Sequence, residues 1–244
     1  GTLRLTLNGV MAKSSNIGTI LAAERIGGKK LSKYLKKFGI GQPTGLNFPG
    51  ESNGFVPEHK NWSPTSFPTI SFGQGLSVNA VQVASVYATI ANDGLRVEPS
   101  LVKRIIHEGG TAEQPAAPKT TRVVSRDTAI QVRAMLESVV GEGGTATNAK
   151  IPGYRVGGKT GTAQVIDERA GGYNDQVIAS FVGMAPADNP QLVVGVFVSQ
   201  PQIGRYGGEL AAPVFKKVSS YALGALQIPP TGSKAPKLAL TFGG

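Results

Sequence analysis

Gly157-Gly158-Lys159-Thr160-Gly161-Thr162-Ala163-Gln164 places one cation among small residues and follows it with two hydroxyl groups two positions apart. Because side chains alternate across a strand, Lys159 and Gly161 would point to one face, and Thr160 and Thr162 to the other. The two hydroxyls can then bind one carboxylate, and the glycines allow another backbone to come close. We interpret the stretch as one wall of a site for an extended peptide that ends in a carboxylate.

The same region also fits the phosphate-binding pattern G-x-x-x-x-G-K-[ST], over Gly153–Thr160. That loop needs a buried apolar strand before it and a long helix after it. The residues from Thr145 to Pro152 do not make a core strand, and a second loop from Asp167 to Gly172 leaves no room for a helix of about 11–12 residues. We therefore disfavour a nucleotide hydrolase. It stays an alternative, together with a glycine-rich strand that has no function.

The composition excludes several kinds of site. The chain has no cysteine, which excludes disulfides, thiol catalysis and thiolate metal ligands but leaves the compartment open. The two histidines, His59 and His107, stand in polar surroundings, which disfavours a histidine-based catalytic triad or a zinc site. We therefore predict neither a metal site nor a cofactor.

The charge balance is basic, with 25 Lys and Arg against 15 Asp and Glu, a formal net charge of +10. A basic surface favours anionic partners such as nucleic acid, anionic lipid or an anionic wall polymer. Nucleic-acid binding is disfavoured because aromatic residues make up only 7% and do not alternate with basic ones. No stretch approaches the ~18 apolar residues of a membrane span. Either the protein is soluble throughout, or an anchor lay upstream and has been removed.

Hydrophobic periodicity and capping residues predict both helices and strands. Ser14 or Ser15 would cap a helix that ends at Gly27-Gly28, and Pro213 would stand in the first turn of the last helix. The buried stripe of that last helix would be Val214, Val218, Tyr221, Ala222 and Ala225. The expected elements are an extended lead-in (1–7), helices at 17–26, 30–38, 79–91, 126–140 and after Pro213, strands at 97–106, 177–184 and 192–199 with the last two antiparallel beside the Lys159 strand, and loops at 39–68 and 109–121.

Several short motifs occur together and in a fixed order. Ser14-Ser15-Asn16 has the form S-x-N and Lys159-Thr160-Gly161 the form K-T-G, two members of one set of catalytic motifs. Their companions are Ala12-Lys13, Phe72-Gly73-Gln74-Gly75, Thr162-Ala163, Ala179–Gly183, Arg205–Gly208 and Ala212–Phe215. With these residues the chain resembles the transpeptidase domain of class B penicillin-binding proteins, in particular the division-type enzymes of actinobacteria. The resemblance covers nearly the whole chain.

This resemblance implies an α+β fold of the penicillin-binding/β-lactamase-like transpeptidase type. A central antiparallel sheet that includes the Lys159 strand would be flanked by helices, with an all-helical subdomain around Ser14. Residues 1–228 would form the C-terminal part of the transpeptidase domain, and residues 229–244 a proline-containing tail, draped or loose.

The sequence departs from the family pattern at the nucleophile. The family holds its reactive serine in an S-x-x-K motif upstream of S-x-N, and no such motif precedes Ser14. The one literal match, Ser100-Leu101-Val102-Lys103, comes in the wrong order and continues into a predicted strand. The chemistry needs the serine at a helix start with the lysine one turn on, so that the amine can take the hydroxyl proton. We interpret the match as accidental and expect a fold that is incomplete at its N-terminus, with the nucleophile on another segment.

The function implied by the resemblance is that of a peptidoglycan D,D-transpeptidase. It would crosslink stem peptides during septal cell-wall synthesis through a serine acyl-enzyme, and β-lactams would inhibit it covalently. Ser14 would relay a proton toward the leaving nitrogen, and Asn16 would hydrogen-bond the substrate backbone amide and the motif lysine. Lys159 would supply a positive charge that keeps the other lysine neutral and attracts the substrate carboxylate.

The K-T-G strand would hold the substrate. Thr160 and Thr162 would bind its carboxylate on either side of Gly161, and the backbone N–H of Thr162 would form half of an oxyanion hole. The adjacent loop from Asp167 to Gln176 would either gate the site or be a plain hairpin loop.

The expected partners follow from the same resemblance. They are stem peptides ending in D-Ala-D-Ala, β-lactams, the N-terminal segment of the same protein that carries S-x-x-K, and membrane proteins of the division complex, with no nucleic acid. The protein would act at the extracytoplasmic face of the bacterial membrane, anchored by an N-terminal transmembrane helix absent from this chain. A second hypothesis is a non-catalytic sensor or pseudoenzyme that recognises penicillin.

Overall fold

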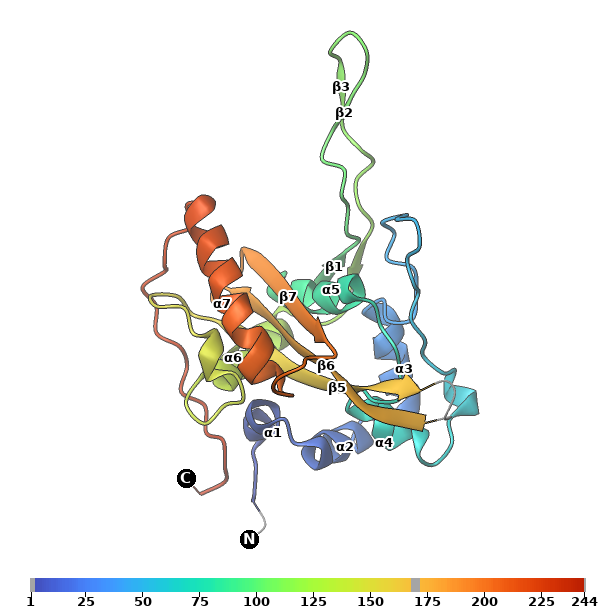
Figure 1. Ribbon diagram of the computed structural model, residues 1–244, viewed down its shortest axis with the longest axis vertical. Helices are drawn as coiled ribbons and strands as arrows, with labels where there is room; N and C mark the ends of the chain where they lie inside the picture. Colours follow the sequence, from blue (N-terminus) through green and yellow to red (C-terminus); the bar gives the residue numbers. More distant parts are fainter. Residues whose placement is uncertain (1–2, 168–171, 244) are drawn as a thin grey trace.

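The centre of the described structure is an antiparallel sheet of three strands (Figure 1). The computed structural model describes residues 3–167 and 172–243. Within them β5 (Gly157–Asp167), β6 (Gly172–Ala185) and β7 (Leu192–Ser199) lie in that order, each antiparallel to its neighbour. Lys159 stands opposite Val182 of β6. The predicted hairpin beside the Lys159 strand is therefore confirmed.

The two faces of this sheet pack against different helices. α7 (Gly207–Ala225) covers one face, where the ring of Phe215 meets that of Phe181 edge-on at a centroid distance of 4.8 Å. α5 (Ala80–Ala91) and α6 (Arg126–Val140) cover the other face. The hydrophobic cluster on that second side contains Ile90, Leu136, Met184 and Ala187. This arrangement is the α+β architecture that the sequence predicts.

The last helix begins earlier than predicted and buries a different face. It starts at Gly207, so Pro213 lies inside it and not in its first turn. The side chains of Val214, Val218 and Tyr221 are exposed, by 42%, 46% and 80%. The buried face consists instead of Gly207, Gly208, Ala211, Ala212, Phe215, Ser219 and Leu223. Small residues bring this helix close to the sheet. The prediction followed the larger apolar residues and therefore assigned the buried stripe to the wrong face of the helix.

Short helices make up the region around Ser14 in the described structure. They are α1 (Leu7–Lys13), α2 (Asn16–Glu24), α3 (Gly28–Lys37) and α4 (Ser66–Ser71), with a 3₁₀ turn, η1 (His59–Asn61), in the long loop before α4. The extended lead-in is wrong from Leu7 onward, because the hydroxyl of Thr6 accepts from the backbone N–H of Gly9 at 3.0 Å and starts a helix there. Among the described residues, no helix has the length and apolar character needed to cross a membrane.

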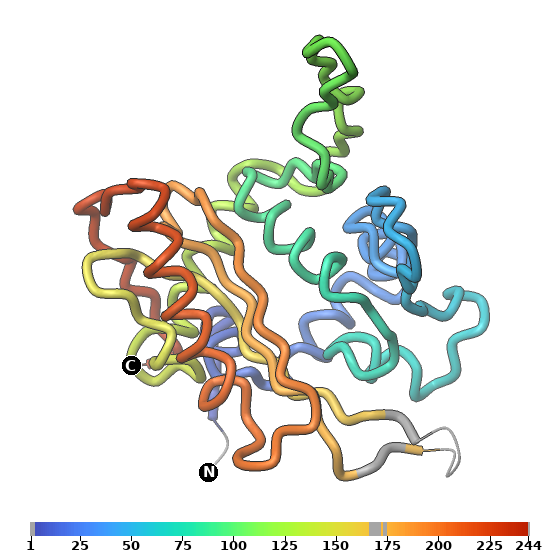
Figure 2. The backbone as a smooth tube through the Cα atoms, turned by 45° about the horizontal axis from the view of Figure 1, so that its top comes forward, coloured from blue at the N-terminus to red at the C-terminus, as the bar shows by residue number. Residues whose placement is uncertain are grey.

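A hairpin arm projects from the body of the molecule (Figures 1 and 2). Its base pairs β1 (Leu95–Val97) with β4 (Thr120–Arg122), and its tip pairs β2 (Ile105–Ile106) with β3 (Ala112–Glu113). The single strand predicted at 97–106 is therefore wrong. The surface loop predicted at 109–121 is confirmed over most of its length, and the short strands at Ala112–Glu113 and from Thr120 onward were missed. Both halves pair with each other over short stretches, which periodicity within either half does not reveal.

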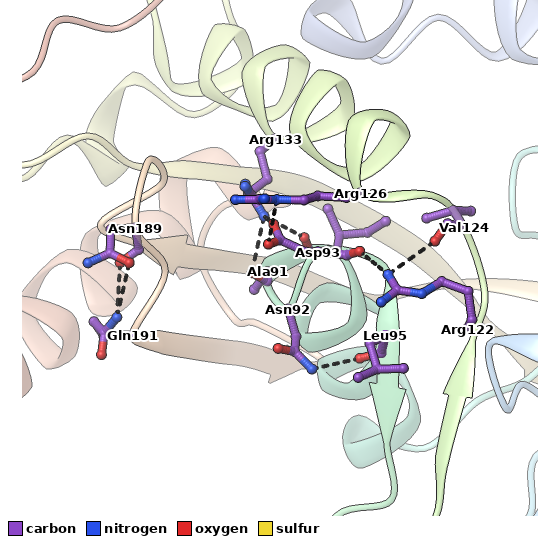
Figure 3. Close-up of polar contacts among 11 residues, drawn as sticks. Ala91, Asn92, Asp93, Leu95, Arg122, Val124, Arg126, Arg133, Asn189 and Gln191 are labelled. Atoms are coloured by element: carbon purple, nitrogen blue, oxygen red, sulfur yellow. Dashed lines mark hydrogen bonds and ion pairs between the residues drawn. The ribbon is translucent and has the colours of Figure 1, made fainter.

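Asp93 joins the base of the arm to α6 (Figure 3). Its carboxylate accepts from Arg133 at 2.8 Å and from Arg126 at 3.1 Å, and its backbone carbonyl accepts from Arg122 of β4. Arg133 is buried and also donates to the carbonyls of Ile90 and Ala91 at the end of α5. One carboxylate and three guanidinium groups thus fix the arm to the two helices behind the sheet.

The C-terminal residues run back across the molecule to α1. The backbone N–H of Thr6 donates to the carbonyl of Leu240 at 3.1 Å, and Asn8 donates to that of Leu238 at 3.2 Å. Further along, Arg155 binds the hydroxyl of Ser233 at 3.0 Å. The segment after 228 is thus draped over the body, and the domain division at 228 stays a prediction.

A buried ion pair lies under that segment. Arg155 donates to both carboxylate oxygens of Glu137, at 2.6 and 2.8 Å, and the side chain of Glu137 is only 5% exposed. The hydrogen bonds raise the pKa of Arg155 further above its ordinary value. The pair links α6 to the start of β5, because Arg155 stands two residues before that strand.

Candidate active site

Ser14 and Ser15 are adjacent, but only Ser15 caps a helix with its side chain. Ser15 caps α2, since its hydroxyl accepts from the backbone N–H of Gly18 at 3.1 Å. Ser14 ends α1 in the left-handed region at φ 55°, which is uncommon for a residue with a side chain. Because Ser15 supplies the cap, the hydroxyl of Ser14 is available for contacts outside the helix, and strained backbone of this kind concentrates at functional sites.

Lys159 lies at the centre of the hydrogen bonds here. Its ammonium donates to the hydroxyl of Ser14 at 2.7 Å, to the carbonyl of Thr160 at 3.1 Å and to the hydroxyl of Thr160 at 3.3 Å. It forms no ion pair with a carboxylate in the described part of the chain. Burial lowers the pKa of Lys159 to about 8. The site thus contains a partly buried cation that no carboxylate of the described residues neutralises, which is suited to a ligand carboxylate.

The predicted residues meet at one cavity of about 600 Å³. The S-x-N residues Ser14 and Asn16 contribute one wall, and the K-T-G strand contributes another. The complete lining is Ser14, Asn16, Thr145, Thr147, Asn148, Thr160, Gly161, Thr162, Tyr206, Gly207, Gly208 and Glu209. Lys159 connects the two walls through its hydrogen bonds. The structure therefore brings all six predicted site residues together, while their individual roles stay predictions.

Other wall residues were missed from the sequence. The hydroxyl of Thr145 lies 2.9 Å from that of Thr160, and Thr147 and Asn148 belong to a 3₁₀ turn, η2 (Thr147–Ala149). Glu209 comes from the first turn of α7. The turn Gly143-Gly144 before Thr145 was the available sequence signal, because it directs the chain back toward the K-T-G strand.

Glycines hold the start of α7 against the strands. A Cβ atom at Gly207 would lie 2.0 Å from the carbonyl oxygen of Ser180, and one at Gly208 would lie 2.1 Å from that of Thr145. Only glycine permits such an approach. The N-terminus of α7 therefore lies at the cavity, where the positive end of the helix favours an anion.

β5 is an edge strand in the described part of the sheet, so one side of its backbone is open to an added strand. At its far end, Gln74 donates to Gln164 at 3.3 Å, which ties the Gly73-Gln74-Gly75 turn to this strand. The loop considered as a gate, Asp167 to Gln176, includes residues 168–171, which lie outside the described residues. Its role stays a prediction.

Two alternatives from the sequence have no support in the geometry. After Gly153–Thr160 the chain continues as strand β5 and not as a helix, so the phosphate-loop interpretation is wrong. Ser100 lies in the exposed arm and bonds the backbone of Val102 at 3.2 Å, outside any helix. Ser100 and Lys103 therefore lack the geometry of a reactive serine and its base. Among the described residues, no three His, Asp or Glu side chains gather as metal ligands would.

Comparison with known proteins places this geometry in a family. The chain matches the penicillin binding protein transpeptidase domain over residues 1–220. It is 41% identical over 249 aligned residues to penicillin-binding protein PbpB of Mycolicibacterium smegmatis, which covers 98% of this chain and 38% of that protein. It is 38% identical to stage V sporulation protein D of Bacillus subtilis, over 93% of this chain and 35% of that protein.

A solved structure agrees in fold. Penicillin-binding protein 3 of Mycobacterium tuberculosis, in complex with ampicillin, matches with a TM-score of 0.92 at 39% identity, over 99% of this chain and 55% of that one. The chain spans well under half the length of the curated relatives cited above. The matching domain, the relatives and the fold agree, and the chain belongs to the transpeptidase domain family of class B penicillin-binding proteins.

Proposed function

We propose that this chain is the C-terminal part of the transpeptidase domain of a peptidoglycan D,D-transpeptidase that β-lactams inhibit. The observation that carries the proposal is the hydrogen bonding of Lys159 to both Ser14 and Thr160 at the wall of one cavity. The relatives named as penicillin-binding proteins, and the ampicillin complex of one of them, support it.

In this proposal the cation and the hydroxyls bind the end of the donor peptide. Lys159 attracts the terminal carboxylate, and the hydroxyls of Thr160 and Thr162 hydrogen-bond it. The backbone N–H of Thr162 contributes to the oxyanion hole, where one donor is typically worth ~2.7–4 kcal/mol of transition-state stabilisation. Asn16 binds the backbone amide of the donor, for which its position in the cavity wall is suitable.

The reaction proceeds in two balanced steps. A serine hydroxyl oxygen attacks the carbonyl carbon of the D-Ala-D-Ala bond and forms an ester, the C–N bond breaks, and the hydroxyl proton passes by way of Ser14 to the leaving nitrogen. The amine of a second stem peptide then attacks the ester carbon, the C–O bond breaks, and the serine oxygen regains a proton from the amine. The product is a crosslink between two stem peptides.

The attacking serine belongs to a segment outside this chain. Two observations support this part of the proposal: the S-x-x-K match at Ser100 lies in the arm, and the related proteins are more than twice as long. The complete protein acts at the extracytoplasmic face of the membrane, where its substrate lies. A transmembrane helix outside this chain holds it there, with membrane proteins of the division complex as partners.

Labelling of the full-length protein with a fluorescent penicillin tests the site. Lys159→Ala should lower the acylation rate by about 10²-fold or more, as removal of one strong electrostatic contact does elsewhere. Lys30→Ala, which removes an exposed cation from α3, is the matched control and should label normally. Normal labelling of Lys159→Ala refutes the proposed site.

Two further measurements examine the nucleophile and the activity. Incubated alone with penicillin, this chain should show no covalent adduct by mass spectrometry, and an adduct on Ser14 or Ser100 would overturn the assignment to another segment. The full-length protein should join two stem peptides in solution. Labelling without any crosslinked product would instead favour the sensor hypothesis.

A further inference from the structure

A second cavity lies beside the catalytic cavity along α7. It has a volume of about 540 Å³ and is lined by Thr147, Asn148, Pro213, Lys216, Lys217 and Ser220. Thr147 and Asn148 of η2 line both cavities, so the two share a wall. Asn148 is held in place by a hydrogen bond of 3.1 Å to the carbonyl of Gly208. The two cavities are therefore neighbours along α7, and we call the second one the α7 groove.

One stripe of α7 faces the two cavities. Glu209, Pro213, Lys216 and Ser220 recur at the spacing of a single helix face, with Lys217 beside them. This stripe is separate from the buried face around Phe215. Glu209 lines the catalytic cavity, and the two lysines line the neighbouring α7 groove.

The charges of this stripe are available to a ligand. Within the described residues, neither lysine has a carboxylate partner within 4.0 Å, and Glu209 forms no ion pair. Both lysines are exposed. The catalytic cavity therefore presents a negative charge, and the neighbouring α7 groove presents two positive charges.

The α7 groove is not needed to bind the donor peptide. Under the proposed function the donor ends at its carboxylate, which lies at Thr160 and Thr162. Thr145 hydrogen-bonds Thr160 and precedes η2, so the groove begins beyond the point where the donor stops. A cavity next to the point where one substrate ends is suited to a second substrate.

The acceptor has to approach from this side. Its amine replaces the leaving nitrogen at the acyl-enzyme carbon, so the remainder of the acceptor lies where the leaving group lay and beyond it. A stem peptide carries free carboxylates as well as its amine. The order of charges from the catalytic cavity to the α7 groove, negative then positive, matches an acceptor whose ammonium leads and whose carboxylates follow.

We propose that the α7 groove binds the acceptor stem peptide, with its carboxylates at Lys216 and Lys217 and its amine directed past Glu209. The inference rests on the proposed function. The new N–C bond forms as the ester C–O bond breaks, and the amine proton passes to the serine oxygen. Lys216 and Lys217 are positioning residues here, because they hold the acceptor without touching the reacting atoms.

A charge reversal in the full-length protein tests this. We would compare Lys216→Glu/Lys217→Glu with Lys29→Glu/Lys30→Glu, which makes the same change of charge on exposed residues of α3, across the molecule from α7 (Figure 1). Penicillin labelling measures only the acylation step, which does not involve the acceptor. Crosslinking of a stem-peptide donor to a soluble acceptor peptide measures acylation together with transfer to the acceptor. A second acceptor, whose carboxylates are converted to carboxamides, shows how much of any change depends on the charge of the acceptor.

The α7 variant should label with penicillin within about twofold of wild type, while its KM for the carboxylate acceptor rises about tenfold. Its KM for the carboxamide acceptor should change far less, and the α3 variant should match wild type throughout. An unchanged KM overturns the proposal, as do equal losses with both acceptors or a parallel loss of labelling. A wild-type protein that neither labels nor crosslinks refutes the proposed function itself, and this inference with it.

Discussion

Raising the pH above 8 should remove the charge that organises the site. Because burial lowers the pKa of Lys159 to about 8, the ammonium form makes up about nine-tenths of the population at pH 7 and about one-tenth at pH 9. If the charge attracts the ligand carboxylate, the second-order rate constant for acylation by penicillin should fall about tenfold between those values. That constant reports the ionisation of the free enzyme, so bound ligand does not shift the profile.

The assay is stopped-flow or quenched labelling of the full-length protein from pH 6 to 10. Lys159→Arg is the control, because a guanidinium stays protonated over the whole range. This variant will be acylated more slowly, because the planar guanidinium group does not reproduce the hydrogen bonds of the lysine to Ser14 and Thr160. Its acylation rate should nevertheless show no decrease with rising pH near pH 8. A flat wild-type profile, or the same descending limb in the arginine variant, would show that Lys159 does not supply the required charge.

Further predictions concern packing and orientation. Glu137→Ala should destabilise the full-length protein by about 1–3 kcal/mol in urea denaturation, because Arg155 loses both hydrogen bonds to that carboxylate and is left with the longer ion pair to Asp188 at 3.7 Å; a loss below 1 kcal/mol would contradict this. Gly207→Ala should cost about 1–3 kcal/mol and slow penicillin labelling, since its Cβ would lie 2.0 Å from a carbonyl oxygen of β6, whereas Gly224→Ala on the same helix meets nothing within 4 Å and should not. Thr145→Val should slow acylation by about fivefold through loss of its hydrogen bond to the motif threonine, and an unchanged rate would show that this bond does not orient the site.

The sheet and the helices behind it could be predicted because local signals agree with the tertiary structure there. α6 has the predicted bounds, since Ser125 caps it and Gly141 follows it. α5 begins after Asn79, whose side chain and that of Gln82 cap it reciprocally. The polar members of the α6 interior were missed, because Arg133 and Glu137 are buried only by virtue of partners that are distant in the sequence.

α1 shows why other elements could not be predicted. Asn8 and Gly9 are poor helix formers, and no helix was predicted over residues 7–13. Its helix is supported from outside by the C-terminal segment, which accepts hydrogen bonds from Thr6 and Asn8. Gly9 is required by this contact, since a Cβ there would lie 1.8 Å from the carbonyl oxygen of Leu240. A contact across more than two hundred residues leaves no periodic signal in either segment.

The candidate site divides in the same way. Ser14, Asn16 and the K-T-G residues were recognisable because each stands in a motif with a fixed spacing. Thr145 and Glu209 carry no motif of their own, and they reach the cavity only because glycines let α7 and the preceding turn approach the strand. Sequence motifs thus identified six residues that meet at the cavity, and only the fold showed which other residues line it.

The direction of the hydrogen bonds around Lys159 fixes what Ser14 can do. An ammonium group donates and cannot accept, so the hydroxyl of Ser14 must be the acceptor of the 2.7 Å bond while the lysine is charged. The proton of Ser14 is then free to point into the cavity, which is the orientation needed to donate to a leaving nitrogen. Once Lys159 loses its proton, its nitrogen can accept from Ser14, and the hydroxyl turns away from the substrate. The same ionisation therefore weakens carboxylate binding and reverses the proton donor, so Ser14→Ala should lower acylation by peptide donors without removing the dependence on pH near 8.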